Sequence, residues 1–334
     1  MISIKDVALE AGVSTATVSR VLANKPHVSP KLKQKVWTAV EKLDYRPNLI
    51  ARSLRSQKSS TLGLIVSDIR NPFFTAISRA VEDTAHKQGY SVFLCNTDED
   101  PEKELLYLNL MQDEHVAGLI FSPTRHSAEH FADLHIHFPT VIIDRQVTAP
   151  NVDMVLIDNV MAGYTLANHL LENGYRRIGG LFGEASTTGR LRRQGLEQAL
   201  REFGLEPMPE LMQFVAPKIE TGREPALALL DTAVPPDALF TTNSLLTAGA
   251  LMAIRERQLH IPQDIALVGF DETIWSQLVE PPVTLVAQPT EEIGRTATEL
   301  LLKRIANPER SMRQVILQTS LLVRGSSLPS TSFQ

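Results

Sequence analysis

The sequence predicts an all-α helix-turn-helix head followed by a two-lobed α/β body with parallel sheets. The first 60 residues contain helical patterns and no strand pattern, whereas from Thr61 onward apolar strand runs alternate with amphipathic helices. The strand-and-helix series restarts near residue 159, and this gives two halves of comparable size. Near-continuous apolar strands separated by helices are typical of parallel sheets covered on both faces, so each half is expected to form one lobe.

The composition excludes several classes of protein. At 334 residues, 43% hydrophobic and 21% charged, the chain is long enough for two or three globular domains. No apolar run approaches the ~18 residues that a membrane helix needs, and charged residues interrupt the N-terminus where a signal peptide would have its apolar core. We therefore expect a cytoplasmic protein without contact to a membrane.

The single cysteine, Cys95, excludes an intrachain disulfide and a cysteine-based zinc site. It lies in the apolar run VFLC, where a buried strand residue is a simpler interpretation than a catalytic thiol. The clustered histidines are irregularly spaced and are expected at the surface rather than in a metal site: His126, His130, His135 and His137. The sequence predicts neither a metal nor a cofactor.

Charge is distributed unevenly along the chain. Residues 1–60 contain 11 Lys and Arg against 4 Asp and Glu, a net charge of +7, which leaves −12 for residues 61–334. A basic head on an acidic body is expected when only the head touches a polyanion. A merely solvated basic face is the alternative, but the charge coincides with the helical motif described next.

The motif is IKDVALEAGVSTATVSRVL, from Ile4 to Leu22. Apolar residues at helical spacing predict a first helix, Gly12 supplies the turn, and Ser14 stands where the N-cap of a second helix belongs. The second helix presents a small, polar and basic face, which suits the major groove of DNA. A helical pair that serves packing only remains the alternative.

A third helix is expected to begin after the N-cap Ser29, with Pro30 in its first turn, and to run to Tyr45. Trp37 is interpreted as the core anchor of the head. The segment Tyr45–Ser60 is then expected to contain a short helix after Asn48 that would form only against DNA and a second copy, with Leu54 as a wedge between base steps. A plain interdomain linker is the alternative.

In the body, strands are predicted at TLGLIVSDI, SVFLCNT, VAGLIFSP, TVIID, MVLID, RIGGLFG, LMQFVA, ALFTT, IALVGFDE, TLVAQP and QVILQTSLLVR. Helices are predicted at residues 74–89, through Met111, and at 162–173, 191–203, 245–257 and 293–305. The polar tail, residues 327–334, is expected to be disordered.

These motifs, in this order and spacing, resemble the lactose-repressor (LacI/GalR) family of transcriptional regulators. The matching segments are IKDVALEAGVSTATVSRVL, HVSPKLKQKVWTAVEKLDYRPNLIARSLR, LGLIVSDIRNPFF, VIIDR, RLRRQGL, ALFTTNSLLTAGAL, IALVGFDET and LVAQP. The resemblance covers nearly the whole chain. It implies a DNA-binding domain at 1–46, a hinge helix and linker at 47–60, and a two-lobed effector-binding and dimerisation domain at 61–326. Within that domain the N-lobe would take about 61–158 plus 289–318, and the C-lobe about 159–288 plus 319–326.

The resemblance also assigns roles to residues of the head. Thr15 and Ala16 would meet base edges, Arg20 would contact a base or a phosphate, and Thr17 and Ser19 would contact phosphates. Asn48 and Ala51 would lie along the minor groove, with Leu54 as the intercalating leucine of the hinge helix. Because Thr15 and Ala16 are small, Arg20 and the shape of the DNA are expected to contribute more of the readout.

The body resembles the two-lobed periplasmic sugar-binding fold, whose lobes close around a small molecule at the carboxyl ends of the strands. Residues that follow strands, or begin the next helix, are chemically suited to bind a sugar by hydrogen bonds and ring packing. They are Asn71, Phe73, Phe74, Asp144, Arg145, Arg190, Arg192, Asn243, Asp271 and Gln288.

Each of these residues has a plainer interpretation. Phe73 and Phe74 could be ordinary core residues, Asn71 could simply cap the helix that follows, and Arg190 and Arg192 could be surface charges. Ser244 stands where many relatives carry an acidic residue. With three arginines nearby, this predicts a cleft richer in cations than in acids, and hence an anionic effector such as a sugar acid or a phosphosugar.

The predicted function is that of a repressor, not an enzyme, which binds double-stranded operator DNA as a homodimer under the control of a small sugar-like effector. A transport receptor without DNA function is one alternative, and an enzyme built on the α/β body is the other. We find no glycine-rich phosphate loop, nucleophile elbow or metal-ligand spacing that would favour an enzyme.

Overall fold

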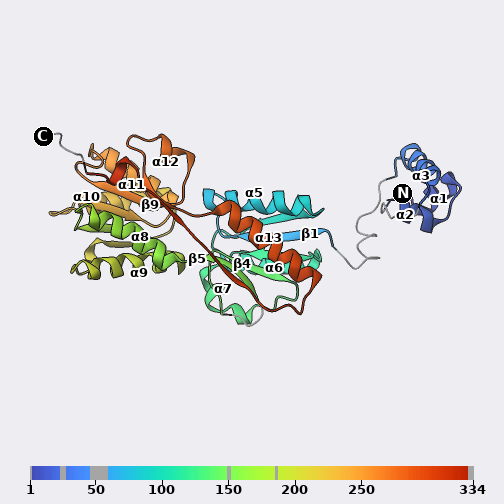
Figure 1. Ribbon diagram of the computed structural model, residues 1–334, viewed down its shortest axis with the longest axis horizontal. Coiled ribbons are helices and arrows are strands. Elements are labelled where there is room, and N and C mark those ends of the chain that lie inside the picture. Colours follow the sequence, from blue (N-terminus) through green and yellow to red (C-terminus); the bar gives the residue numbers. More distant parts are fainter. Residues whose placement is uncertain (1, 23–27, 46–58, 149–151, 185–186, 330–334) are drawn as a thin grey trace. The chain divides into compact units, whose positions relative to one another are not determined.

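The computed structural model describes residues 2–22, 28–45, 59–148, 152–184 and 187–329, and the chain divides into two compact units, residues 1–59 and 60–334 (Figure 1). In the described part of the chain, no helix combines the length and the apolar character needed to cross a membrane.

The first unit is a three-helix head made of α1 (Ile4–Ala11), α2 (Thr15–Leu22) and α3 (Pro30–Lys42). The N-terminus of α1 is closed by reciprocal bonds between Ser3 and Asp6, whose carboxylate accepts from the Ser3 backbone N–H at 2.7 Å. Gly12 ends α1 in the left-handed region at φ 63°, a conformation that glycine adopts without steric cost. As predicted, Ser29 caps α3 and Pro30 occupies its first turn.

The prediction that Trp37 anchors the head was wrong, because its side chain is 46% exposed. Each residue turns an α-helix by about 100°, so the stripe that contains Val36 and Val40 continues through Ala39 and not through Trp37. The core of the head is built instead from small aliphatic side chains: Val7, Ala8, Ala11, Val18, Val21, Val36, Ala39 and Val40. The helix α3 also ends earlier than predicted, at Lys42.

The second unit contains two six-stranded sheets with the same order of strands. In the first sheet the order is β2-β1-β3-β4-β5-β11, and all neighbouring strands are parallel. Its strands are β1 (Thr61–Val66), β2 (Ser91–Asn96), β3 (Gly118–Phe121), β4 (Thr140–Ile143), β5 (Asp153–Ile157) and β11 (Gln314–Leu317). Around it lie α5 (Pro72–Lys87), α6 (Pro101–Asp113), α7 (Arg125–Glu129) and α13 (Thr290–Ala306).

In the second sheet the order is β7-β6-β8-β9-β10-β12, and only the edge pair β10–β12 is antiparallel. Its strands are β6 (Ile178–Gly183), β7 (Met212–Val215), β8 (Ala238–Thr241), β9 (Ala266–Phe270), β10 (Thr284–Ala287) and β12 (Ser320–Leu322). The accompanying helices are α8 (Asn159–Glu172), α9 (Thr187–Glu202), α10 (Ile219–Leu230), α11 (Ser244–Glu256) and α12 (Ile274–Leu278).

The chain passes between the two lobes three times, after β5, after β10 and between β11 and β12 (Figure 1). The last passage divides the single predicted strand at 314–324 into two short strands that belong to different sheets. Three of the α-helices described in the body were not predicted. Two of them, α7 and α12, have only five residues, and α10 contains Pro225, which obscures its helical pattern.

The tail was predicted to be disordered from residue 327 onward, and the structure shows that this start is too early in the chain. Ser327 is fully buried, and its hydroxyl lies 2.8 Å from Nε2 of His169 and 2.7 Å from Oγ1 of Thr284. Polar residues can therefore be ordered here because buried partners satisfy their hydroxyl groups.

Two glycines fix the distance between α8 and α9. A Cβ on Gly163 would lie 2.2 Å from the carbonyl oxygen of Arg192, and one on Gly195 would lie 2.1 Å from that of Val160. Only glycine permits so close an approach of the two backbones. This packing places the inner face of α9 beside the N-terminal turn of α8.

Candidate functional site

A cavity of about 200 Å³ lies at the carboxyl ends of the strands and is lined by both lobes. In both sheets the order of the first five strands is 2-1-3-4-5, which leaves a crevice beside the first strand where the chain switches direction. Residues directly after β1, β4, β8 and β9 line the cavity, as this topology requires.

Nine of the ten predicted ligand residues line this cavity: Asn71, Phe73, Phe74, Asp144, Arg145, Arg192, Asn243, Asp271 and Gln288. Arg190 is not among the lining residues. Its side chain is 47% exposed, and its Nη2 lies 2.9 Å from Oε1 of Glu129. Side chains two positions apart on an α-helix point about 200° away from each other. The helix α9 can therefore direct Arg192 into the cavity only by turning Arg190 away from it.

The lining contains further residues that the sequence analysis missed: Ser67, Asp68, Arg70, Asp98, Glu99, Gly183, Thr188, Gly189, Ala216, Pro217, Lys218 and Thr242. Several of them follow strand ends and could have been found by extending the same rule to every strand. Asp98 and Glu99 both have positive φ, 54° and 61°, a feature of the turn after β2 that the sequence pattern does not reveal.

Arg145 is held inside the N-lobe by several acceptors. Its Nη1 donates to Oε2 of Glu99 and to the carbonyl of Pro123, both at 2.9 Å, and its Nη2 bonds the other oxygen of Glu99. Burial acts to lower the pKa of the guanidinium, but the charge and hydrogen bonds of Glu99 raise it overall. The positive charge of Arg145 is therefore largely neutralised by protein groups.

Arg192 is buried in a different way. Its Nε donates to Oδ1 of Asn159 at 2.8 Å, its Nη1 donates to the carbonyl of Thr242 at 2.6 Å, and its guanidinium lies 4.2 Å from the centre of the Phe270 ring. No carboxylate of the described residues lies within 4 Å of it, and burial lowers its pKa. A buried cation without an ionic partner is suited to hold the oxygen atoms of a ligand.

Two carboxylates face the same space from opposite lobes. Asp144 and Asp271 both have positive φ, 67° and 69°, which turns each side chain sharply at the end of its strand. Burial raises the pKa of Asp144 to about 6, and burial also raises that of Asp271, while Arg192 acts in the opposite direction on both. Gln288 donates to Oδ1 of Asp271 at 2.6 Å, so this carboxylate is held in place by a crossover residue.

The apolar part of the cavity comes from Phe73 and Phe74 at the start of α5. Both are buried, and their rings meet edge to face with centroids 5.0 Å apart. Asn71 is the N-cap of α5, since its Oδ1 accepts from the backbone N–H of Phe73 at 3.1 Å. Asn243 caps α11 in the same manner. The plainer interpretation of Asn71 is therefore true, although this residue also lines the cavity.

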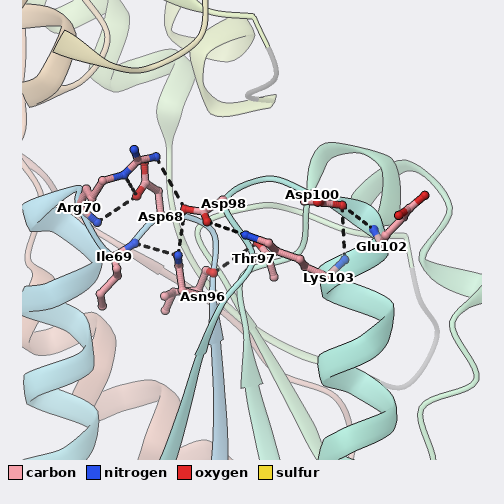
Figure 2. A network of polar contacts seen from close by, with 10 residues as sticks. Asp68, Ile69, Arg70, Asn96, Thr97, Asp98, Asp100, Glu102 and Lys103 are labelled. Atoms are coloured by element: carbon pink, nitrogen blue, oxygen red, sulfur yellow. Dashed lines mark hydrogen bonds and ion pairs between the residues drawn. The ribbon is translucent and has the colours of Figure 1, made fainter. Parts of the chain in front are cut away.

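A network of polar contacts fixes one edge of the cavity (Figure 2). Arg70 forms two hydrogen bonds with Asp68, at 3.0 and 3.1 Å, and its Nη2 lies 3.7 Å from Asp98. Asp98 in turn accepts from Lys103 at 2.8 Å and from Asn96 at 2.9 Å. The network joins the loop after β1 to the loop after β2 and to the first turn of α6.

The cavity is not richer in cations than in acids, so this expectation was wrong. Its lining holds the five carboxylates of Asp68, Asp98, Glu99, Asp144 and Asp271, against the four cations Arg70, Arg145, Arg192 and Lys218. The loops after β1 and β2 supply the acids that the sequence analysis did not count.

In the head, the predicted DNA-contact residues of α2 lie at the surface. Thr15, Ala16, Ser19 and Arg20 are exposed, whereas Thr17 is half-buried and its hydroxyl lies 2.9 Å from that of Ser14. Val18 and Val21 on the opposite side fill the core. Asn48, Ala51 and Leu54 fall outside the described residues.

Comparisons with known proteins match both units. Residues 3–48 match a family model described as bacterial regulatory proteins, lacI family, and residues 167–327 match one described as a periplasmic binding protein-like domain. The chain is 34% identical over 332 residues to the HTH-type transcriptional regulator DegA of Bacillus subtilis, covering 98% of each sequence. It is also 34% identical to an HTH-type transcriptional repressor PurR of Haemophilus influenzae, again over 98% of each.

Solved structures agree with these matches. A lac repressor dimer bound to operator and the anti-inducer ONPF superposes with a TM-score of 0.88 at 26% identity, over 98% of this chain and 99% of that one. A complex of the transcriptional regulator CelR with cellobiose gives a TM-score of 0.74 at 29% identity, over 98% and 100% of the two chains.

Proposed function

The chain belongs to the lacI family of bacterial regulatory proteins, and from this premise we propose that it represses transcription by binding a specific operator, under the control of a sugar-like effector. The observation that supports the proposal most directly is the cavity between the lobes, where buried polar groups converge beside two aromatic rings.

The head is suited to read the major groove. Its second helix is short and exposes hydroxyl groups, a methyl group and Arg20, while its valines hold it against the other two helices. The net charge of +7 over residues 1–60 supplies the electrostatic attraction to phosphates. Each neutralised phosphate is expected to make the slope of log affinity against log salt more negative by about 0.9.

We propose that the operator is pseudo-palindromic and is bound by a homodimer. The body carries apolar side chains that a second copy would cover. Ile274 and Leu278, one turn apart on α12, are 80% and 78% exposed, and Leu105 and Leu106 are exposed on α6. Replacing Leu278 by Glu should lower the mass measured by light scattering toward that of one chain. Val234→Glu, at another exposed apolar position, is the matched control.

The effector is proposed to be polyhydroxylated. The lining combines carboxylates, amides and guanidinium groups, which together can donate to and accept from each hydroxyl, and Phe73 and Phe74 can pack against a sugar ring. Because carboxylates outnumber cations in the lining by five to four, the charge balance favours a neutral sugar over a sugar acid or a phosphosugar. Calorimetry with D-glucose, D-ribose, D-gluconate and D-glucose 6-phosphate tests this preference, and tight binding of the anions alone would reverse it.

Regulation is proposed to follow from linkage. Closure of the two lobes on the effector would change how two copies place their heads and hinge segments, and operator affinity would change by the coupling free energy, about 1–3 kcal/mol. A transport receptor or an enzyme on the same body would lack this coupling, since neither needs a DNA-binding head.

The decisive experiment selects operators from random duplex DNA with the full chain, followed by gel shifts between 50 and 200 mM salt. We expect enrichment of a palindromic site and loss of affinity with salt. Absence of enrichment at low salt would refute DNA recognition. For the effector, Arg192→Met should abolish the response of the shift to any active sugar, whereas Arg201→Met, on the same helix and outside the lining, should retain it.

A further inference from the structure

Three charged residues connect the two lobes through their side chains. Glu129, at the end of α7 in the N-lobe, accepts hydrogen bonds at a single oxygen, Oε1. One comes from Nη2 of Arg190 on α9 of the C-lobe at 2.9 Å, and the other from Nε of Arg125 on α7 at 3.1 Å. We call these three residues the clasp.

A second contact of the clasp crosses between the lobes. Nη1 of Arg125 donates to the backbone carbonyl of Glu184, which follows β6 in the C-lobe, at 3.4 Å. The hydrogen bonds from Arg190 and then from Arg125 hold the pKa of Glu129 below its ordinary value, so its carboxylate stays charged at neutral pH. The two lobes are therefore joined at this place by a charged centre with a donor on each side.

The clasp differs from the three chain passages between the lobes. The passages are covalent and persist whether the lobes open or close, whereas the hydrogen bonds of the clasp exist only while α7 and α9 are close together. None of the three side chains lines the cavity. They can act on a bound molecule only through the relative position of the lobes.

We propose that Glu129, Arg125 and Arg190 are positioning residues that stabilise the closed arrangement of the lobes and so raise the affinity of the cavity for its effector. The inference rests on the proposed effector binding but assigns it a new determinant. A molecule enclosed by both lobes binds more tightly when the closed state is already populated.

The expected effect is modest, since the clasp is partly exposed. The side chains of Arg190, Glu129 and Arg125 are 47%, 41% and 42% exposed. Exposed ion pairs are weak and are screened by salt, so removing the clasp should weaken effector binding by about two- to fivefold. The same loss should follow in the native protein at about 1 M salt, where the screening length falls to about 3 Å.

The test measures lobe separation without effector or DNA. Spin labels are placed at exposed positions on the two lobes through Glu114→Cys and Glu206→Cys, with Cys95 left in place because it is buried. Labelled chains are diluted with unlabelled ones, so that only distances within one chain are observed. Pulsed dipolar spectroscopy then compares the native clasp with Arg190→Glu, with Glu129→Arg and with the combined swap.

Each single charge reversal brings like charges together: Arg190→Glu leaves two carboxylates at the clasp, and Glu129→Arg leaves three cations. The combined swap again places two cations beside one carboxylate. We expect the distance distribution to lengthen and broaden in both single variants and to return in the swap. Arg223→Glu is the matched control, because Arg223 pairs with Glu256 within one lobe at similar exposure. It should leave the distance unchanged.

Identical distances in all variants, or a swap that fails to restore the native distribution, would overturn the proposal. Binding of D-glucose and D-ribose to the same variants gives the second readout, with the two- to fivefold loss in the single reversals and recovery in the swap. The distance measurement needs neither sugar nor operator. A negative result for the clasp would therefore leave the proposed function untouched, and an operator selection without enrichment would leave the proposal for the clasp untouched.

Discussion

Replacing Asp144 by Asn should make the stability of the body less sensitive to pH. Burial at the end of β4 raises the pKa of this carboxyl from 3.8 to about 6. A folded-state pKa above the unfolded value gives stability that is fully present below pH ~4 and is lost as pH rises through ~6. Asn stays neutral throughout and also tolerates the positive φ of 67° at this position.

The magnitude follows from the size of the shift. A difference of about 2 pKa units corresponds to about 3 kcal/mol between the protonated and charged forms. The free energy of unfolding of the variant, relative to the native protein, should therefore rise by about 2–3 kcal/mol between pH 4 and pH 7. Urea unfolding of the full chain, followed by far-ultraviolet circular dichroism at several pH values, measures this difference.

A control of opposite sign is available in the same body. The hydrogen bond from Arg257 lowers the pKa of the exposed Asp231, so this carboxylate contributes stability above its unfolded pKa that is lost as pH falls. Asp231→Asn should therefore lose stability relative to the native protein as pH rises toward 4, and its difference from the native protein should stay nearly constant from pH 4 to pH 7. If the difference for Asp144→Asn stayed constant over that range, the argument from its burial would be wrong.

Three further outcomes are expected. Gly195→Ala should destabilise the body by about 1–3 kcal/mol, because its Cβ would lie 2.1 Å from the carbonyl oxygen of Val160; an unchanged melting temperature would contradict this. Arg304→Met should cost about 3–5 kcal/mol in urea unfolding by leaving the charge of buried Asp153 without its cationic partner, and adding Asp153→Asn should recover part of the loss. Ser14→Ala should destabilise α2 by about 1 kcal/mol, seen as faster amide exchange confined to the head.

Much of the fold could be predicted from the sequence because the signals are local. Helical and strand periods, Gly12 at a turn and Ser29 at an N-cap each depend on a few neighbouring residues, and the structure confirms them. The order of strand and helix also led to parallel sheets in two lobes. Local signals failed for short helices such as α7 and α12, which form too few turns to produce a period.

The candidate site was predictable as far as it follows strand ends. Asp144 and Asp271 stand directly after apolar runs, and in a parallel sheet such positions gather at one edge. The acids after β2 were missed, since Asp98 and Glu99 reach the cavity through a turn with positive φ. The charge of the lining was therefore misjudged.

What the sequence by itself determined is the kind of most elements, the family and the identity of nine of the 21 lining residues, because these depend on neighbours along the chain. Only the tertiary structure decided that Arg192 enters the cavity while Arg190 reaches Glu129 in the other lobe. It likewise decided that Ala39 and not Trp37 fills the core of the head. The physical reason is that the phase of a helix is set by what it packs against, and those partners lie far away in the sequence.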